Sequence, residues 1–223
     1  MRQIPLPIGA LPAPAFDNFL TGANAPAVAH LEALTAQAAP VYLWGVSGSG
    51  KTHLMQALVH RFEAQGLRAG WFSAADPAPW ASDEACALIA IDHCDALDAG
   101  QQHAAFTLFV DAATRGVPVI ASGRVPPVDL PLREDLRTRL GWGHVFAIQP
   151  LSEPEARAAL RREADRRALF FSDDVMDYLL TRFSRDLKHL MALLDRLDEF
   201  SLATKRAITV PLLKQMLAEE RKA

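Results

Sequence analysis

Residues 45–52, which read GVSGSGKT, are the part of the sequence most able to do chemistry, because they fit the pattern GxxxxGK[ST]. In such a loop the backbone amides converge on phosphate oxygens, and the start of the following helix adds a favourable dipole. Lys51 is expected to neutralise the outer phosphates, and the Thr52 hydroxyl is expected to ligate Mg²⁺. The pattern predicts a loop that binds ADP or ATP with Mg²⁺. The cofactor-binding candidates in it are Gly45, Val46, Ser47, Gly48, Ser49, Gly50, Lys51 and Thr52.

A carboxylate suited to the same metal ion ends an apolar run at residues 88–92, which read LIAID. This run predicts a buried strand that ends at Asp92, 40 residues after Thr52. That position is typical of a Walker B aspartate, which holds the Mg²⁺ shell through water.

His93 follows Asp92, where many P-loop ATPases carry a carboxylate that polarises the attacking water. A histidine can do this only when neutral, and it lacks the permanent negative charge. The alternative is a histidine at the strand end that faces solvent or a neighbouring loop. Either way, we expect weak hydrolysis by this chain alone.

The elements that must position these groups alternate between strand and helix. Strands are predicted at Val41–Trp44, 69–73, 87–92, 117–122 and 145–148, and helices at 51–65 and 101–115. This alternation predicts an α/β fold in which helices flank both faces of a parallel sheet.

The pattern changes near Pro150, beyond which only helices are predicted. Ser152 and Glu155 form a capping box, and further helices are expected to begin near Ser172, Arg185 and Thr209. Residues 1–14 contain four prolines, which predicts an extended arm. We therefore expect three parts, namely the arm at 1–14, a nucleotide-binding base domain at 15–150 and a small all-helical lid domain at 151–223.

Taken together, the P-loop, the Walker B strand and the helical lid resemble the AAA+ superfamily, and further motifs resemble the clade of the initiator DnaA. Residues 16–24 (FDNFLTGAN) are similar to the segment whose apolar side chains and Asn edge lie beside adenine. Residues 135–143 (DLRTRLGWG) are similar to its box VII. The resemblance implies that Phe19, Leu20, Asn24 and Arg185 bind cofactor, the last as sensor 2, that Ser122 is sensor 1, and that Arg139 is an arginine finger acting in trans.

The arm contains QIPLPI at residues 3–8, which resembles the QLxLPL peptide that binds the β sliding clamp. The chain ends with the lid, so we expect no helix-turn-helix DNA-binding domain. This combination resembles the Hda family of DnaA regulatory inactivators. The resemblance implies that Gln3, Leu6 and Ile8 bind the clamp of DNA polymerase III, that DNA is reached only through the clamp, and that the chain stimulates hydrolysis of DnaA-bound ATP.

Each signal has a simpler alternative. The hexapeptide could be a plain proline-rich tail, Arg139 could be a surface ion-pair partner, and Arg185 an ordinary helix-start arginine. For the whole chain, the alternatives are an independent AAA+ ATPase of the helicase-loader kind and a DNA-binding module. An independent ATPase would be expected to carry a carboxylate after Asp92, and a DNA-binding module would be expected to have a basic face. The sequence leaves homo-oligomer formation open.

Composition limits the possibilities further. The 223 residues have a net charge of −3 and are 22% charged, which argues against a protein that coats nucleic acid by charge. Two cysteines at separate positions favour a reducing cytoplasm. The longest apolar runs are too short to cross a bilayer, and no secretory signal is expected.

Overall fold

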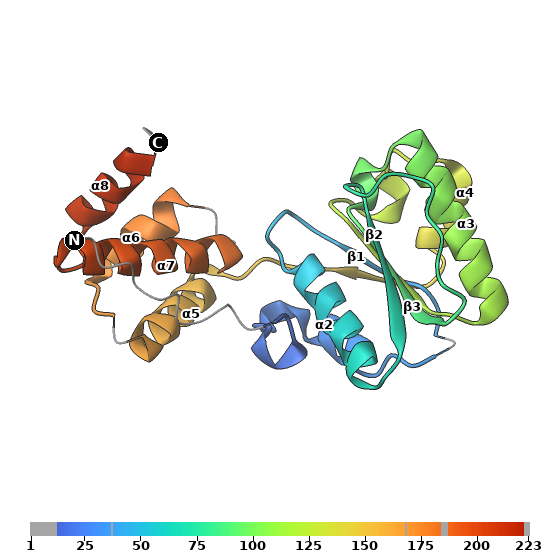
Figure 1. Cartoon of the computed structure of the whole chain (residues 1–223), viewed down its shortest axis with the longest axis horizontal. Helices are drawn as coiled ribbons and strands as arrows, with labels where there is room; N and C mark the ends of the chain where they lie inside the picture. Colours follow the sequence, from blue (N-terminus) through green and yellow to red (C-terminus); the bar gives the residue numbers. More distant parts are fainter. Residues whose placement is uncertain (1–12, 37, 168, 184–186, 221–223) are drawn as a thin grey trace. The chain divides into compact units, whose positions relative to one another are not determined.

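A computed structural model describes residues 13–36, 38–167, 169–183 and 187–220. The chain divides into two compact units between Pro150 and Leu151 (Figure 1). The first unit, Ala13–Pro150, contains the β-sheet, and the described part of the second consists of helices and their connections.

Five parallel strands form one sheet in the order β2-β3-β4-β1-β5. β3 is buried along nearly its whole length, which is the pattern of a strand covered on both faces. Because all strands run the same way, their carboxyl ends meet at one edge of the sheet and their amino ends at the other. The strands are β1 (Val41–Trp44), β2 (Arg68–Ser73), β3 (Cys86–Asp92), β4 (Val119–Gly123) and β5 (His144–Ala147).

Helices cover both faces of this sheet, on either side of the strands in Figure 1. On one face, Leu31, Leu54 and Leu58 from two helices are fully buried against the strands. On the other face, Leu108 and Leu136 take the equivalent places. The predicted α/β class, a parallel sheet flanked by helices, is confirmed. The helices are α1 (Ala25–Glu32), α2 (Lys51–Ala64), α3 (Ala99–Arg115) and α4 (Glu134–Leu140).

The fourth strand begins two residues later than the prediction at 117. Gly116 ends α3 with a φ of 68°, and the amide of Val117 still donates to the carbonyl of Ala112 at 2.8 Å. Pro118 follows and has no amide to offer a ladder. The end of α3 therefore uses residues that composition alone assigns to the strand.

In the described part of the second unit, four helices and the chain that joins them bury one apolar core that includes Leu160, Leu179, Leu194 and Leu213. The predicted capping box at Ser152 is confirmed, since its amide donates to Glu155 Oε2 at 2.8 Å. No helix in the described ranges is long and apolar enough to span a membrane. The helices are α5 (Glu153–Arg166), α6 (Asp173–Arg182), α7 (Leu187–Thr204) and α8 (Val210–Glu220).

Candidate nucleotide-binding site and arginine face

The P-loop connects the carboxyl end of β1 to the first turn of α2, as the motif requires. Gly45 has a φ of 151°, and a Cβ there would collide with the carbonyl of Ile148. Gly50 has a φ of 100° and precedes the helix. Both positions require glycine, and together they turn the chain sharply from strand into helix.

Four backbone amides of this segment donate to no acceptor among the described residues, namely those of Gly48, Gly50, Lys51 and Thr52. All four lie in the loop or in the first turn of α2, where a helix leaves its amides free. Such amides are donors for an anion at the positive end of the helix dipole.

Lys51 is buried, and its ammonium group donates to two carbonyls of its own loop, Gly45 O at 2.8 Å and Val46 O at 2.9 Å. Among the described residues, no carboxylate lies within ion-pair distance of it. Burial lowers the pKa of Lys51, and the charges of Asp92 and Asp95 act in the opposite direction. Its third acceptor is the Ser49 hydroxyl at 3.5 Å, so all its partners are neutral, and a buried cation of this kind is suited to a polyphosphate ligand.

Asp92 lies at the carboxyl end of β3 and is only 2% exposed. Its Oδ2 accepts from the hydroxyl of Thr52 at 2.7 Å, and its Oδ1 accepts from the hydroxyl of Ser122. Strand register explains the second contact, because Ile91 of β3 pairs with Ala121 of β4, so the following residues are neighbours. The structure therefore brings together the predicted Walker B, metal-ligand and sensor 1 residues. An oxygen set of this kind, one hydroxyl and one carboxylate beside a phosphate loop, is suited to Mg²⁺.

His93 adopts a left-handed conformation with a φ of 58°, which is uncommon for residues other than glycine. Its ring Nδ1 lies 3.3 Å from Asp92 Oδ2, and its side chain is 61% exposed. The imidazole thus contacts the Walker B carboxylate and faces solvent at the same time.

Two of the three residues expected at adenine have unexpected partners. Phe19 packs against the P-loop, where a Cβ at Gly50 would lie 2.6 Å from its ring. Asn24 is 4% exposed, and its amide is paired with the backbone of Gln149, whereas Leu20 is half-buried. The Gln149 partner was not predicted, because 125 residues separate it from Asn24 and no local signal marks it.

Arg139 lies at the opposite, amino edge of the sheet, at the end of α4. The chain from α4 enters β5 beside the start of β1, since His144 pairs with Val41. The P-loop leaves the other end of β1, about 13 Å away along a strand of this length. Arg139 is therefore remote from the phosphate loop of its own chain.

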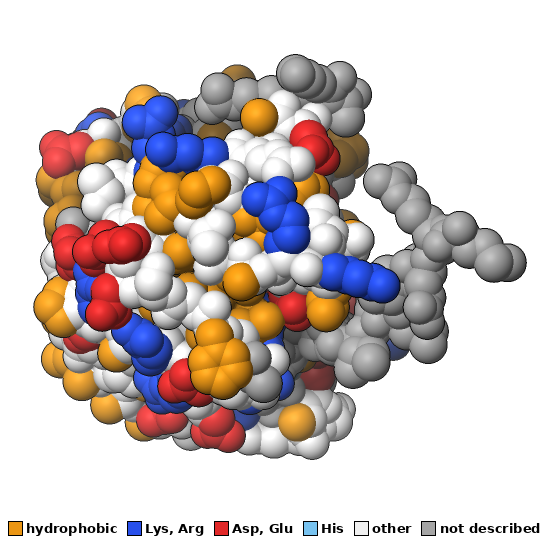
Figure 2. Space-filling view, turned by 90° about the vertical axis from the view of Figure 1, so that its left-hand side faces the viewer, with side chains coloured by type: hydrophobic (Ala, Val, Ile, Leu, Met, Phe, Trp, Pro, Cys, Tyr) orange, Lys and Arg blue, Asp and Glu red, His pale blue; other side chains and the backbone are white. Residues whose placement is uncertain are grey.

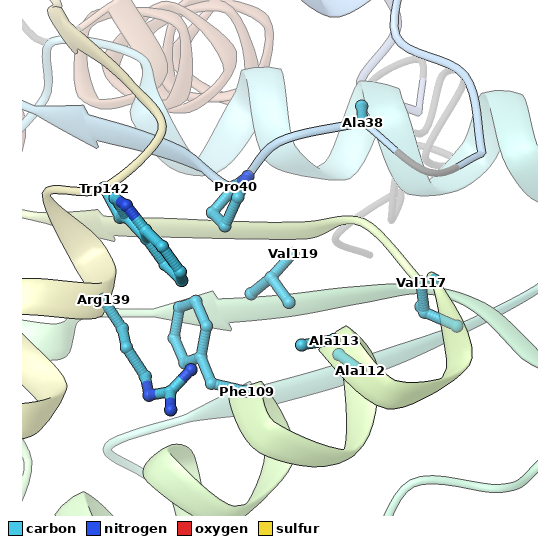
Figure 3. Close-up of a pocket in the computed structure, with 10 residues that line it drawn as sticks. Ala38, Pro40, Phe109, Ala112, Ala113, Val117, Val119, Arg139 and Trp142 are labelled. Carbon is cyan, nitrogen blue, oxygen red and sulfur yellow. The ribbon is translucent and has the colours of Figure 1, made fainter.

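At this amino edge, the guanidinium of Arg139 lies 5.0 Å from the centre of the Phe106 ring. Among the described residues, no carboxylate lies within ion-pair distance of it. A hollow of about 350 Å³ lies beside Arg139, and its lining includes Arg139, Trp142, Phe109 and Pro40 (Figure 3). Trp142 is 77% exposed. Phe106 was not predicted, although an aromatic on the helix before the motif could have suggested it.

The predicted clamp residues Gln3, Leu6 and Ile8 and the predicted sensor 2 residue Arg185 lie outside the described residues. Several other arginines of the second unit are paired with carboxylates, among them Arg157 with Asp177 and Arg161 with Asp173. On the face drawn in Figure 2, basic and acidic side chains of the described residues are intermingled. This face does not have the basic character that a DNA-binding module would need.

Comparison with known proteins gives two family matches and a consistent fold. Residues 153–217 match the model of the Hda lid domain, and residues 12–70 match the bacterial DnaA ATPase domain. Domain III of the replication initiation protein DnaA from Thermotoga maritima is similar, with a TM-score of 0.76 at 17% identity over 94% of this chain and 97% of that one.

Two other solved structures share the fold. AMPPCP-bound DnaA from Aquifex aeolicus has a TM-score of 0.72 at 20% identity, over 95% of this chain and 71% of that one. A variant of RuvB from Thermotoga maritima has a TM-score of 0.67 at 16% identity, over 92% and 71%. These similarities to solved structures concern the fold.

Proposed function

This chain is a AAA+ protein of the DnaA clade that resembles Hda, and on that premise we propose that it is a negative regulator of the initiation of DNA replication. In this proposal it binds adenine nucleotide with Mg²⁺, attaches to the β sliding clamp through its arm, and stimulates hydrolysis of the ATP held by DnaA.

Nucleotide binding is supported by the geometry of the carboxyl edge. Free amides and the buried Lys51 would hold the phosphates, and the Thr52 hydroxyl would ligate Mg²⁺, with Asp92 acting through water. When bound, Mg²⁺ would neutralise charge on the phosphates. Phe19 and Leu20 would contact the base from the segment that packs on the P-loop.

The observation that carries the regulatory proposal is the location of Arg139. It lies at the amino edge, away from its own P-loop, over an aromatic ring and with no described carboxylate paired to it. An arginine placed this way is too far from its own P-loop to serve the nucleotide there, so in this proposal it acts on the nucleotide of another molecule. Arginines supplied by a partner accelerate phosphoryl transfer by about 10³–10⁵.

The experiment is single-turnover decay of DnaA-bound ATP in the presence of clamp loaded on DNA. Arg139→Ala should remove the stimulation while the variant keeps its fold, its own ADP and its clamp contact. Arg137→Ala is the matched control, because residues two apart point to different sides of a helix and Arg137 does not line the hollow. Undiminished decay with Arg139→Ala would refute the finger and leave a nucleotide-dependent adaptor.

Clamp binding is supported only by the sequence of the arm, whose Gln3, Leu6 and Ile8 would enter an apolar groove as an extended segment. Capture of this chain by purified clamp, with and without residues 1–8, tests this part separately. Deletion should abolish capture without changing the melting temperature, and retained capture would contradict the assignment.

An independent ATPase is the second candidate, and the intact contacts among Asp92, Thr52 and Ser122 favour it. It predicts turnover by the purified chain in the ordinary range, roughly 1–10³ s⁻¹. The regulatory proposal predicts much slower turnover, because His93 stands where a carboxylate usually polarises water.

A further inference from the structure

The side chain of Asn24 forms a long-range contact that the nucleotide proposal does not use. Its Nδ2 donates to the carbonyl of Gln149 at 3.0 Å, and the amide of Gln149 donates to its Oδ1 at 2.8 Å. The Asn24 side chain therefore pairs with both the backbone N–H and the backbone carbonyl of Gln149, as the backbone of a neighbouring strand would. With 4% of its surface exposed, Asn24 has little left to present to a base.

Gln149 lies where the chain leaves the sheet. The backbone amide of the preceding residue, Ile148, donates to Trp44 O at 2.7 Å. The carbonyl of Ile148 occupies the space that a Cβ on Gly45 would need. Pro150 and then Leu151 follow, and the second unit begins at Leu151. The linker, residues 148–151, is thus held at its start, Ile148 by the last residue of β1 and Gln149 by Asn24, with Ile148 packed closely against the first residue of the P-loop.

Asn24 is also tied to the opposite end of the candidate nucleotide site. Five residues before it, Phe19 packs directly on Gly50 of the P-loop. Asn24 ends the short turn Gly22–Asn24 and comes immediately before α1. A ligand that orders Phe19 and Leu20 therefore acts on a short, packed segment that ends at Asn24, the residue that hydrogen-bonds to Gln149 of the linker.

We propose that Asn24 is a positioning residue, which couples nucleotide binding to the linker through Gln149 and does not read the adenine edge. The inference rests on the proposed nucleotide binding. Coupling is reciprocal: if nucleotide strengthens the contact between Asn24 and Gln149, then loss of that contact weakens nucleotide binding by the same factor.

The first experiment measures ADP affinity by calorimetry and exchange of the Gln149 amide by NMR, with and without ADP. In the wild type, ADP should slow this exchange about tenfold or more. In Asn24→Ala, ADP should leave the exchange unchanged, and affinity should fall about tenfold. Asn18→Ala is the matched control, because Asn18 makes two similar but local backbone contacts, with Ala13 and Ala15, and should behave as wild type.

A second variant breaks the same contact from the other side. Gln149→Pro removes the backbone N–H that donates to Asn24 Oδ1, and it should lower ADP affinity by a similar factor although Gln149 itself is exposed. The double variant should lose no more than the larger single loss. Unchanged affinity in Gln149→Pro would overturn the coupling, and this arm stays informative if Asn24→Ala does not fold.

Direct base contact gives a different result. If Asn24 reads adenine, then Asn24→Ala should lower the preference for ADP over GDP and leave ADP-dependent exchange at Gln149 as in wild type, and the proposal would be wrong. A lower melting temperature with unchanged ADP affinity would also overturn it, as a purely structural contact. Failure of nucleotide binding itself is recognised separately, by a wild type that does not bind ADP.

Discussion

The two edges of the sheet hold charged groups in opposite conditions. At the carboxyl edge, Lys51 and Asp92 are buried, and neighbours in the same chain bind their polar atoms. At the amino edge, Arg139 lies over an aromatic ring with no described carboxylate beside it, and Trp142 is largely exposed. Burial of a charge is costly unless it is paired. The contrast fits the proposal made above, in which the carboxyl edge binds this chain's own nucleotide and Arg139 acts on the nucleotide of another molecule.

The largest expected effect comes from a conservative change at the amino edge. Arg139→Lys keeps the charge but loses the planar fork that spans two oxygens, so stimulation of DnaA-bound ATP hydrolysis should fall about 10³-fold. Single-turnover ATP decay measures it. Arg137→Lys should retain full stimulation, and equal losses in both variants would break the distinction between the edges.

The next effect concerns the carboxyl edge. His93→Asp restores a carboxylate beside Asp92, and aspartate tolerates the left-handed backbone found there. Turnover of ATP by the purified chain should rise about 10²-fold, because a positioned base is worth this much. His93→Asn is the neutral control and should stay slow; a rise in both variants would mean that loss of the imidazole, not gain of a base, is responsible.

A smaller effect is expected on binding. Lys51→Ala removes the buried cation of the P-loop and should lower the affinity for ADP by about tenfold or more, as measured by titration calorimetry. Lys214→Ala, an exposed change in the second unit, should bind ADP as wild type does. Equal affinity of Lys51→Ala and wild type would show that the carboxyl edge does not hold the phosphates.

The smallest effect is a pH dependence at the amino edge, where the His30 and His144 ring centres lie 4.2 Å apart. Burial, followed by the neighbouring His144, lowers the pKa of His30 below its ordinary value of 6.5. The unfolded chain therefore binds the proton more readily. The free energy of unfolding should fall as the pH drops below about 6.5 and should gain nothing from this group above it.

His30→Phe tests this pair, because a ring of similar shape cannot titrate and the buried His30 Nε2 has no hydrogen-bond partner among the described residues. The variant should gain about 1 kcal/mol near neutral pH and lose part of the acid dependence in denaturant titrations. An unchanged acid slope would place the titrating group elsewhere.

Contiguous motifs were predicted best. The strands at 41–44 and 87–92 and the helix after the P-loop match the structure to within one residue at each end, since buried strands and amphipathic helices leave a local apolar pattern. The helix α1 was not predicted, although Pro26 in its first turn and buried Ala27, Val28 and Leu31 gave a signal. Boundaries shifted where caps competed with strands, as at Gly116.

The phosphate loop could be identified from eight consecutive residues, because they supply its amides, its cation and its hydroxyl, and local backbone geometry is enough to assemble them. Which distant groups meet depends on the packing of the folded chain. Strand register places Ser122 beside Asp92, the entry into β5 places Arg139 at the edge opposite the P-loop, and Asn24 closes on Gln149 across 125 residues. Such contacts depend on how whole elements pack, and no local periodicity encodes the pairing of residues so far apart in the chain.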